Sequence, residues 1–154
     1  YGRRMPIEGE YVPSPSQWVA DQVAEYEASG GTRANTLRET GIPVIIVTMW
    51  GARTGKVRKI ALMRVEHEGS WALVASKGGA PTHPEWYANL LADPQVMVQD
   101  GPTPVDAVVR LVTGDERALW WDRAVAVFPL YADYEVTATA AGREIPVFVA
   151  DPVV

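Results

Sequence analysis

Cysteine is absent from this chain of 154 residues, and histidine occurs only twice. Without cysteine there is no disulfide framework, no thiolate nucleophile and no cysteine-based zinc site, and two histidines cannot complete a typical zinc shell. We therefore predict no metal. The longest nearly apolar run, residues 42–50, is about half as long as a membrane-spanning helix. We expect a soluble, cytoplasmic protein.

Basic residues are outnumbered, because 14 Lys and Arg face 19 Asp and Glu and the net charge is −5. This balance argues against a nucleic-acid partner, which would need a basic surface for its phosphates. Residues 40–65 nevertheless contain no acid and hold five cations: Arg53, Lys56, Arg58, Lys59 and Arg64. Positive charge is therefore concentrated in one segment of an acidic chain.

The length and the apolar fraction of 47% are typical of one globular domain, so we expect residues 1–154 to fold as a unit. An irregular arm is predicted at residues 1–13. A helix should follow within residues 14–30, where Ser14 and Gln17 have capping-box spacing and two glycines end the pattern. Its acidic polar face argues against membrane contact, so we expect it to dock on the core or on a partner.

Strand patterns dominate the remainder of the chain. We predict strands at residues 43–50, 57–66, 70–76, 96–99, 105–112 and 145–150. Helices are predicted at residues 83–92 and 113–128, each opened by a threonine with a glutamate three residues later. This order of elements indicates an α+β fold, an antiparallel barrel with packed helices, and not a parallel doubly wound sheet.

The first candidate site is the basic turn at residues 51–56, together with the cation that follows it. Gly51 and Gly55 allow a tight turn with exposed amide donors, and Arg53, Lys56 and Arg58 would suit a phosphate or carboxylate. The turn lacks the GK[ST] ending of a Walker A loop. A solvated basic hairpin turn is the alternative interpretation.

The second candidate site is the loop Ala-Ser-Lys-Gly-Gly-Ala at residues 75–80, between a predicted strand and a predicted helix. Ser76, Lys77 and the flexible backbone amides could contact a planar polar ligand, with Trp86 and Tyr87 nearby in the next helix. An ordinary strand-to-helix loop is the alternative. Because this loop and the basic turn join the same antiparallel meander, we expect them to face one groove.

The third candidate site holds Tyr131 and Tyr134, after a predicted helix that ends at a proline. Two tyrosines three residues apart could present both hydroxyls on one side of a turn, as hydrogen-bond or proton donors to a substrate carbonyl. Packing in the core is the alternative. His67 and His83 stand alone, and we interpret them as surface or helix-start polarity.

Five segments, in order, carry a family resemblance: residues 48–58 (TMWGARTGKVR), 74–79 (VASKGG), 83–90 (HPEWYANL), 93–99 (DP, then VMVQ) and 128–147, which holds FPLYADY and REIPV. Together they resemble the deazaflavin-dependent nitroreductase family, whose members use the reduced deazaflavin coenzyme F420. The resemblance implies a split β-barrel, mostly antiparallel and six-stranded, with packed helices. Split barrels of this kind often pair, so a homodimer is a possible assembly.

The resemblance also implies a reaction. Family members transfer a hydride from reduced F420 to an electron-poor acceptor, which is a conjugated alkene, a quinone or, in some members, a nitro compound. Tyr131, Tyr134 and Ser76 would bind the carbonyl of this small-molecule acceptor. The implied cofactor-binding residues are Arg53, Thr54, Gly55, Lys56, Arg58, Ala75, Ser76, Lys77, Gly78, Trp86, Tyr87 and Asn89.

Two departures from the family pattern bear on the substrate. Met63 stands where the nitroimidazole-reducing member has a tyrosine, which argues against nitro reduction. Residues 136–142 form a longer and less distinctive link than usual after the second tyrosine. Two alternative functions remain open at this point: an oxidoreductase that uses flavin mononucleotide on the same barrel, and a non-catalytic deazaflavin carrier.

Overall fold

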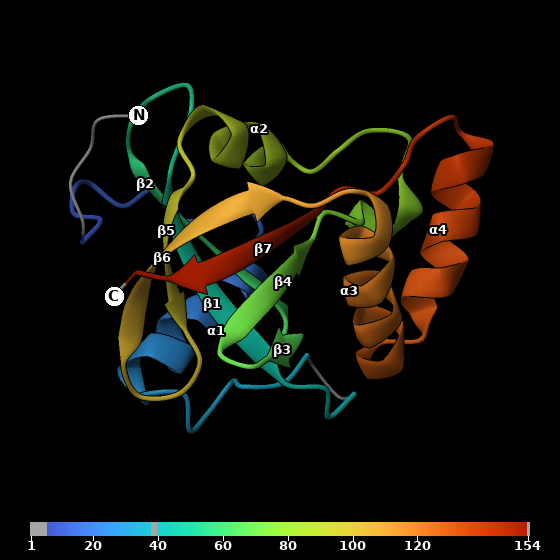
Figure 1. The fold of residues 1–154 in the computed structure, drawn as a ribbon. Helices are drawn as coiled ribbons and strands as arrows, with labels where there is room; N and C mark the ends of the chain where they lie inside the picture. Colours follow the sequence, from blue (N-terminus) through green and yellow to red (C-terminus); the bar gives the residue numbers. More distant parts are fainter. Residues whose placement is uncertain (1–5, 38–39, 154) are drawn as a thin grey trace.

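Seven antiparallel strands form one curled sheet in the computed structural model, which describes residues 6–37 and 40–153 (Figure 1). The strands are β1 (Val44–Trp50), β2 (Val57–Met63), β3 (Glu66–His67), β4 (Ser70–Val74), β5 (Gln95–Gln99), β6 (Pro104–Leu111) and β7 (Val147–Pro152). Their order across the sheet is β2-β1-β5-β6-β7-β4-β3. The edge strand β2 also contacts β4, near the opposite edge, so the sheet curls into a barrel that is split between these two strands.

The strands lie close to their predicted positions, with one difference. The predicted strand at residues 57–66 is divided into β2 and β3, which makes seven strands and not six. Met63 is the last residue that pairs with β1, whereas Glu66 pairs with Trp71 of β4. The chain thus changes its pairing partner from β1 to β4 at the split. A single straight strand cannot pair with both, because they lie on opposite sides of the split.

Strand β1 is buried along its whole length, as its β-branched sequence predicts. Ile45 and Val47 point into the barrel and join its main apolar cluster. Val44 faces outward, where helix α1 (Gln17–Ala28) covers it with Val23 and Tyr26. The predicted N-terminal helix therefore docks on the core of its own chain.

Three further helices pack around the sheet: α2 (Glu85–Ala92), α3 (Gly114–Val127) and α4 (Leu130–Ala140), and a short 3-10 turn, η1 (Lys77–Gly79), precedes α2. Helices α3 and α4 stand side by side at one end of the sheet (Figure 1). Thr113 is the N-cap of α3, as predicted, whereas Ser16 and Pro84 take the N-caps predicted for Ser14 and Thr82. None of these three N-caps makes the side-chain bond of a capping box. Among the described residues, no helix is both long enough and apolar enough to cross a bilayer.

Helix α4 departs most from the sequence-based expectation. Pro129 does end α3, but it also occupies the N-cap of α4 with φ −57°. Proline is favoured at the start of a helix, where its missing N–H leaves no hydrogen bond unmade. Tyr131 and Tyr134 therefore lie on a helix and not on a turn, and the supposed link at residues 136–142 is helical as far as Ala140.

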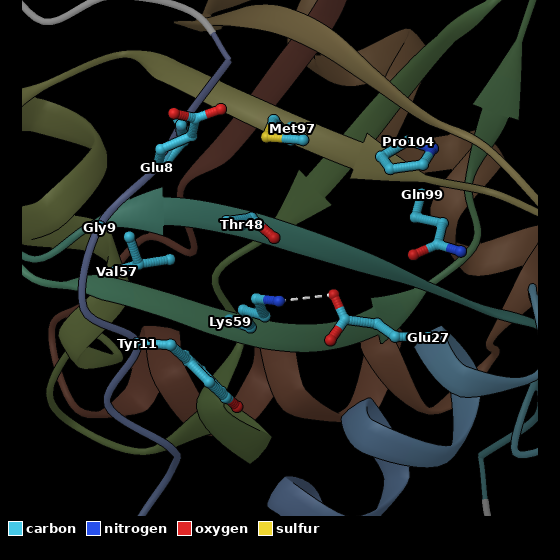
Figure 2. Close-up of a pocket in the computed structure, with 11 residues that line it drawn as sticks. Glu8, Gly9, Tyr11, Glu27, Thr48, Val57, Lys59, Met97, Gln99 and Pro104 are labelled. Atoms are coloured by element: carbon cyan, nitrogen blue, oxygen red, sulfur yellow. Dashed lines mark hydrogen bonds and ion pairs between the residues drawn. The ribbon is translucent and has the colours of Figure 1, made fainter.

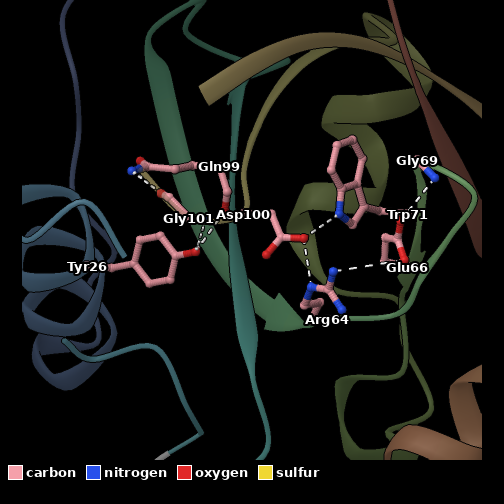
Figure 3. Close-up of polar contacts among 8 residues, drawn as sticks. All are labelled: Tyr26, Arg64, Glu66, Gly69, Trp71, Gln99, Asp100 and Gly101. Carbon is pink, nitrogen blue, oxygen red and sulfur yellow. Dashed lines mark hydrogen bonds and ion pairs between the residues drawn. The ribbon is translucent and has the colours of Figure 1, made fainter. Parts of the chain in front are cut away.

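A polar cluster fastens α1 and the ends of β2 and β4 to the turn after β5 (Figure 3). Asp100 accepts hydrogen bonds through Oδ2 from Arg64 Nε at 2.7 Å and from Trp71 Nε1 at 3.0 Å. The buried Tyr26 hydroxyl donates to a backbone carbonyl of β5 at 3.2 Å and accepts the N–H of Gly101 at 2.9 Å. These bonds hold α1 against the barrel beside the split.

Candidate functional site

A cleft of about 430 Å³ opens along the split, between β2 and the segment that follows β4. Six of the predicted site residues line it: Ser76, Lys77, Gly78, Trp86, Tyr131 and Tyr134. The other lining residues are apolar: Trp18, Leu37, Ala61, Leu62, Met63, Val74, Pro84 and Phe128. The fold thus brings the predicted loop and the predicted tyrosines together, although more than fifty residues separate them in the sequence.

The loop after β4 places backbone N–H groups at this cleft. Ser76 has right-handed helical angles (φ −73°, ψ −43°), whereas Lys77 and Gly78 have φ of 47° and 62°. A right-handed residue followed by left-handed ones turns successive N–H groups toward one point, which makes a nest for a negatively charged oxygen. Within the described part of the chain, the N–H groups of these three residues and the Ser76 hydroxyl make no hydrogen bond to protein.

Arg143 lies behind the loop and is only 7% exposed. Its guanidinium donates to the carbonyl oxygens of Ala75 at 3.0 Å, Ala80 at 2.7 Å and Ser76. Its Nη1 also lies 2.9 Å from Nδ1 of His83. Ala75, a predicted cofactor residue, is fully buried. Arg143 opens the REIPV run that carries part of the resemblance, but sequence reasoning assigned it no role, because its partners are backbone oxygens 63 to 68 residues earlier.

His83 directly precedes the N-cap of α2, which agrees with the predicted helix-start position, but its side chain is half-buried and not a free surface group. Its ring lies 4.3 Å from that of Tyr87, centre to centre, and Tyr87 packs in turn on Phe148 at 5.8 Å. Burial and the charge of Arg143 lower the pKa of His83. The ring is therefore neutral near pH 7, and its Nδ1 accepts a hydrogen bond from Arg143. Tyr87, a predicted cofactor residue, supports this contact and does not line the cleft.

Tyr131 and Tyr134 stand three residues apart on α4 and thus share one face of the helix. Their rings lie 6.3 Å apart, and both contact Phe128, at 5.0 Å and 5.9 Å. Tyr131 is 4% exposed, and its pKa lies well above the usual range. Burial is the larger cause of this shift, and the neighbouring Tyr134 is the smaller one. The phenol of Tyr131 therefore keeps its proton at all physiological pH values and can act as a hydrogen-bond donor.

Helix α2 connects the cleft to the basic turn. Trp86 and Asn89 lie three residues apart on the same helix face. Trp86 lines the cleft, whereas Asn89 accepts the N–H of Ala52 through Oδ1 at 2.8 Å and holds its Nδ2 3.7 Å from Met49 Sδ. The basic turn at residues 51–56 is therefore fixed to the far end of α2 and does not itself line the cleft.

The basic turn is closed by its own hydrogen bonds. The N–H of Gly55 donates to the carbonyl of Gly51 at 2.9 Å, and the N–H of Gly51 donates to the carbonyl of Lys56 at 2.7 Å. The Thr54 hydroxyl accepts the N–H of Lys56 at 3.2 Å. Thr54 and Gly55 thus shape the turn.

The cations of this region differ in their partners. Lys56 forms an ion pair with Glu10 at 2.7 Å, and Lys59 forms one with a glutamate of α1 at 2.7 Å. Within the described residues, Arg53 and Arg58 have no carboxylate within 4.0 Å. These two arginines therefore remain available to an anionic ligand that reaches beyond the cleft.

A second cavity, of about 360 Å³, lies on the outer face of the sheet, between α1 and the arm that begins the described chain (Figure 2). Its cation, Lys59, is paired with Glu27 at 2.7 Å and lies 4.9 Å from the ring centre of Tyr11. Glu8 adds further negative charge at this cavity. None of the predicted site residues lines it, and its one lysine is already neutralised.

The cleft along the split offers donors and apolar surface, and no carboxylate of residues 6–37 or 40–153 lines it. In the described ranges, no three His, Asp or Glu side chains are grouped closely enough to hold a metal ion. Hydroxyl and N–H donors beside an apolar wall suit a planar ligand that carries carbonyl oxygens.

Known proteins share this sequence pattern. Residues 18–152 match the family model described as F420H(2)-dependent quinone reductase. Rv3178 of Mycobacterium tuberculosis, which is named for F420H(2)-dependent quinone reduction, is 32% identical over 113 residues, or 72% of this chain and 91% of that protein. The F420H(2)-dependent quinone reductase Rv1261c of the same species is 38% identical over 60 residues, or 39% of this chain and 40% of that protein.

Solved structures share the fold. A structure of an F420-H2 dependent reductase (FDR-A) is 46% identical with a TM-score of 0.66, over 71% of this chain and 94% of that one. A structure described as a domain-swapped dimer is 42% identical with a TM-score of 0.68, over 90% of this chain and 100% of that one. These matches confirm the predicted resemblance, the predicted class of fold and reduced F420 as the cofactor. The chain belongs to the F420H(2)-dependent quinone reductase family.

Proposed function

We propose that this protein transfers a hydride from reduced F420 to the conjugated carbonyl system of a quinone or an activated alkene. The observation that carries the proposal is the cleft along the split, which is lined by Ser76, Tyr131 and Tyr134. Among the described residues, these three hydroxyls make no hydrogen bond to the protein, so all three are available to a ligand. Three donors around an apolar hollow are what a carbonyl-bearing acceptor requires.

The residues of the cleft fit the ring of the cofactor. The nest at Ser76, Lys77 and Gly78 would hold an oxygen of its carbonyl-bearing edge, and Trp86 would close the site from α2. When bound, reduced F420 supplies the hydride, and the protein supplies orientation and electrostatics.

The residues beyond the cleft fit the anionic tail of the cofactor, which has a phosphodiester and an oligoglutamate chain. Arg53 and Arg58 would bind these anions, since neither has a carboxylate partner in the described structure. From Met63 in the cleft to Arg58 the chain runs five residues along β2, which is about 17 Å at about 3.3 Å per residue. A ligand with its ring at one end and its charges at the other matches this layout.

The same cleft would stabilise the acceptor as it is reduced. Addition of a hydride to a quinone or an enone moves negative charge onto a carbonyl oxygen, and a donor aimed at that oxygen typically accelerates such a reaction about 100-fold or more. Burial keeps the Tyr131 phenol protonated. Tyr131, Tyr134 and Ser76 would therefore bind the carbonyl and strengthen their hydrogen bonds as its charge grows.

The wall of the cleft favours apolar acceptors. Trp18, Leu37 and Ala61 line it, and Met63 adds a side chain without a hydrogen-bond donor. We therefore propose quinones and conjugated carbonyl compounds as better substrates than nitro compounds. A nitro group would be bound better by a tyrosine hydroxyl at position 63 than by the side chain of Met63.

A homodimer is a further proposal. It is supported by the similarity to a structure described as a domain-swapped dimer. Light scattering on the purified protein would test it, and a single monomeric peak across the working concentrations would reject it.

The test of the function is spectrophotometric. Oxidation of reduced F420 is followed with a quinone, cyclohexenone and a nitroimidazole, using wild type, Tyr131→Phe and Tyr134→Phe. We expect each variant to lower kcat about tenfold or more and to change the Kd for F420 less than about twofold. The control is Tyr26→Phe, a buried tyrosine outside the cleft, which should leave both values unchanged.

Two outcomes would contradict the proposal. If the Kd for F420 rises sharply while kcat at saturation holds, the tyrosines bind the cofactor and not the acceptor. If wild type binds reduced F420 tightly and no acceptor oxidises it, the protein is a carrier.

A further inference from the structure

The buried guanidinium of Arg143 has no carboxylate partner within 4.0 Å among the described residues. Its hydrogen bonds go to the carbonyl oxygens of Ala75, Ser76 and Ala80 and to His83 Nδ1. A buried cation is tolerated only when its N–H groups are satisfied. All four of these acceptors belong to the loop that borders the cleft and to the residues leading into α2.

We propose that Arg143 is a positioning residue, which holds the loop at residues 75–80 so that the N–H groups of Ser76 and Lys77 face the cleft and bind an oxygen of the cofactor. This inference rests on the proposed function for the identity of the ligand. The claim that Arg143 holds the loop in its conformation does not depend on the ligand, because it is argued from hydrogen bonds within the protein.

The orientation follows from the planarity of the peptide group. In a trans peptide the C=O and the N–H point in opposite directions. The carbonyl of Ala75 points at Arg143, so the N–H of Ser76, in the same peptide group, points away from it. The carbonyl of Ser76 likewise accepts from Arg143, so the N–H of Lys77 points away. Arg143 thus aims two of the three nest donors from behind.

The same bonds strengthen the donors. A guanidinium that binds a carbonyl oxygen polarises that peptide group, and its N–H becomes a better donor in a medium of low dielectric constant. Arg143 binds two successive peptide groups, those that carry the N–H of Ser76 and of Lys77. Its charge therefore reaches the cleft through the backbone.

The loop needs such support because its conformation is unfavourable on its own. Lys77 has φ of 47°, a region that side chains with a Cβ rarely adopt. Two backbone hydrogen bonds join described residues of the loop to each other, from the N–H of Gly79 to Ser76 at 2.9 Å and from that of Ala80 to Lys77 at 3.1 Å, and the N–H of Ala75 donates to Pro146 at 2.9 Å. The fork of Arg143 adds bonds from outside the loop.

Lysine cannot take the same part. The planar fork of arginine reaches four acceptors in fixed directions, whereas an ammonium group has three donors on one atom. His83 completes the fork, because its neutral ring accepts at Nδ1.

The test compares Arg143→Gln and Arg143→Lys with a matched control, Arg117→Gln. Arg117 also donates to a backbone carbonyl, that of Ile145 at 2.7 Å, and also has a mostly buried side chain, but it lies on α3, where it contacts Trp121 and Glu144 and not the loop. Two readouts are measured on each protein: amide hydrogen exchange at Gly79 and Ala80 in the free protein, and the Kd for oxidised F420 by fluorescence titration.

We expect Arg143→Gln to speed exchange at both amides at least tenfold and to raise the Kd at least tenfold. Arg143→Lys should fall between this variant and wild type, and it remains informative if Arg143→Gln does not fold. Arg117→Gln should leave both readouts within about twofold of wild type, even if its melting temperature falls.

Three results would overturn the inference: unchanged exchange in both Arg143 variants, faster exchange without weaker binding, or equal effects in Arg117→Gln. Failure of the proposed function looks different. If wild type does not bind F420 at all, that function fails, whereas the exchange data still decide whether Arg143 orders the loop.

Discussion

Replacement of Gly79 by alanine should disturb the cleft more than the same change one residue earlier. A Cβ at Gly79 would lie 2.7 Å from the carbonyl oxygen of Tyr134, 3.0 Å from its Cα and 3.1 Å from Thr137 Cβ. The first two are backbone atoms of α4, so they cannot rotate away. Gly79 also has φ of +80°, which disfavours any residue with a Cβ.

The magnitude follows from two contributions. The left-handed backbone costs about 1 kcal/mol, and overpacking against α4 costs about 2 kcal/mol, so Gly79→Ala should lose about 3 kcal/mol. Gly78 has φ of +62° with nothing within 4 Å of its Cβ position, so Gly78→Ala should lose only the first, about 1 kcal/mol. In a chain of this size the melting temperatures should fall by about 6–12 °C and about 2–4 °C.

The assay is urea and thermal unfolding of both variants beside wild type, followed by circular dichroism, with kcat measured on the folded proteins. Because relief of the contact must push α4 and Tyr134 outward, Gly79→Ala should also lower kcat, whereas Gly78→Ala should change it less. Equal losses of stability in the two variants would refute the reasoning, since they would mean that the loop and α4 are not in the close contact described here.

Three other perturbations test separate parts of the structure. Tyr26→Phe leaves the N–H of Gly101 without its partner and should cost about 1–3 kcal/mol of unfolding free energy in urea, with the Kd for F420 unchanged; an unchanged free energy would show that the bond adds nothing. His83 has a lowered pKa, so the unfolded chain takes up a proton near pH 6.5 while the folded one resists; stability is complete above that pH and falls as the pH is lowered through the folded-state pKa. His83→Gln should remove this part of the acid loss in melting curves from pH 8 to 5, and parallel curves for the two proteins would contradict it. Arg53→Ala or Arg58→Ala should each weaken F420 about fivefold, or about 1 kcal/mol, but weaken an analogue without the glutamate tail less; equal losses for both ligands would exclude a role in tail binding.

Local patterns accounted for most of the elements. The β-branched run of β1 indicated a strand buried on both faces, because apolar residues without polar alternation leave no face for water. The placement of β4, β5, β6 and β7 followed from similar runs between turn residues. The capping boxes failed because spacing alone does not show whether a side chain turns back to its helix. The prediction of a turn after Pro129 was wrong because proline is compatible both with the end of one helix and with the start of the next.

The candidate residues were foreseen as separate motifs, but their relations were not. The loop at residues 75–80 and the tyrosine pair were each recognisable by composition, and the resemblance assigned them to one site. Among the described residues, Lys56 pairs with Glu10 whereas Arg53 and Arg58 have no acidic partner. A cluster of cations in the sequence could not show this difference, because an ion pair depends on which segments meet.

Composition and short-range order are properties of neighbouring residues, and they were enough for the class of fold, the acid-free basic segment and the family. Contacts across more than fifty residues depend on how the sheet curls and where α4 packs, so the tertiary structure alone could bring Arg143 behind the loop and both tyrosines to the split. The backbone oxygens that Arg143 binds occur at every residue of the chain, and only folding selects which of them it meets.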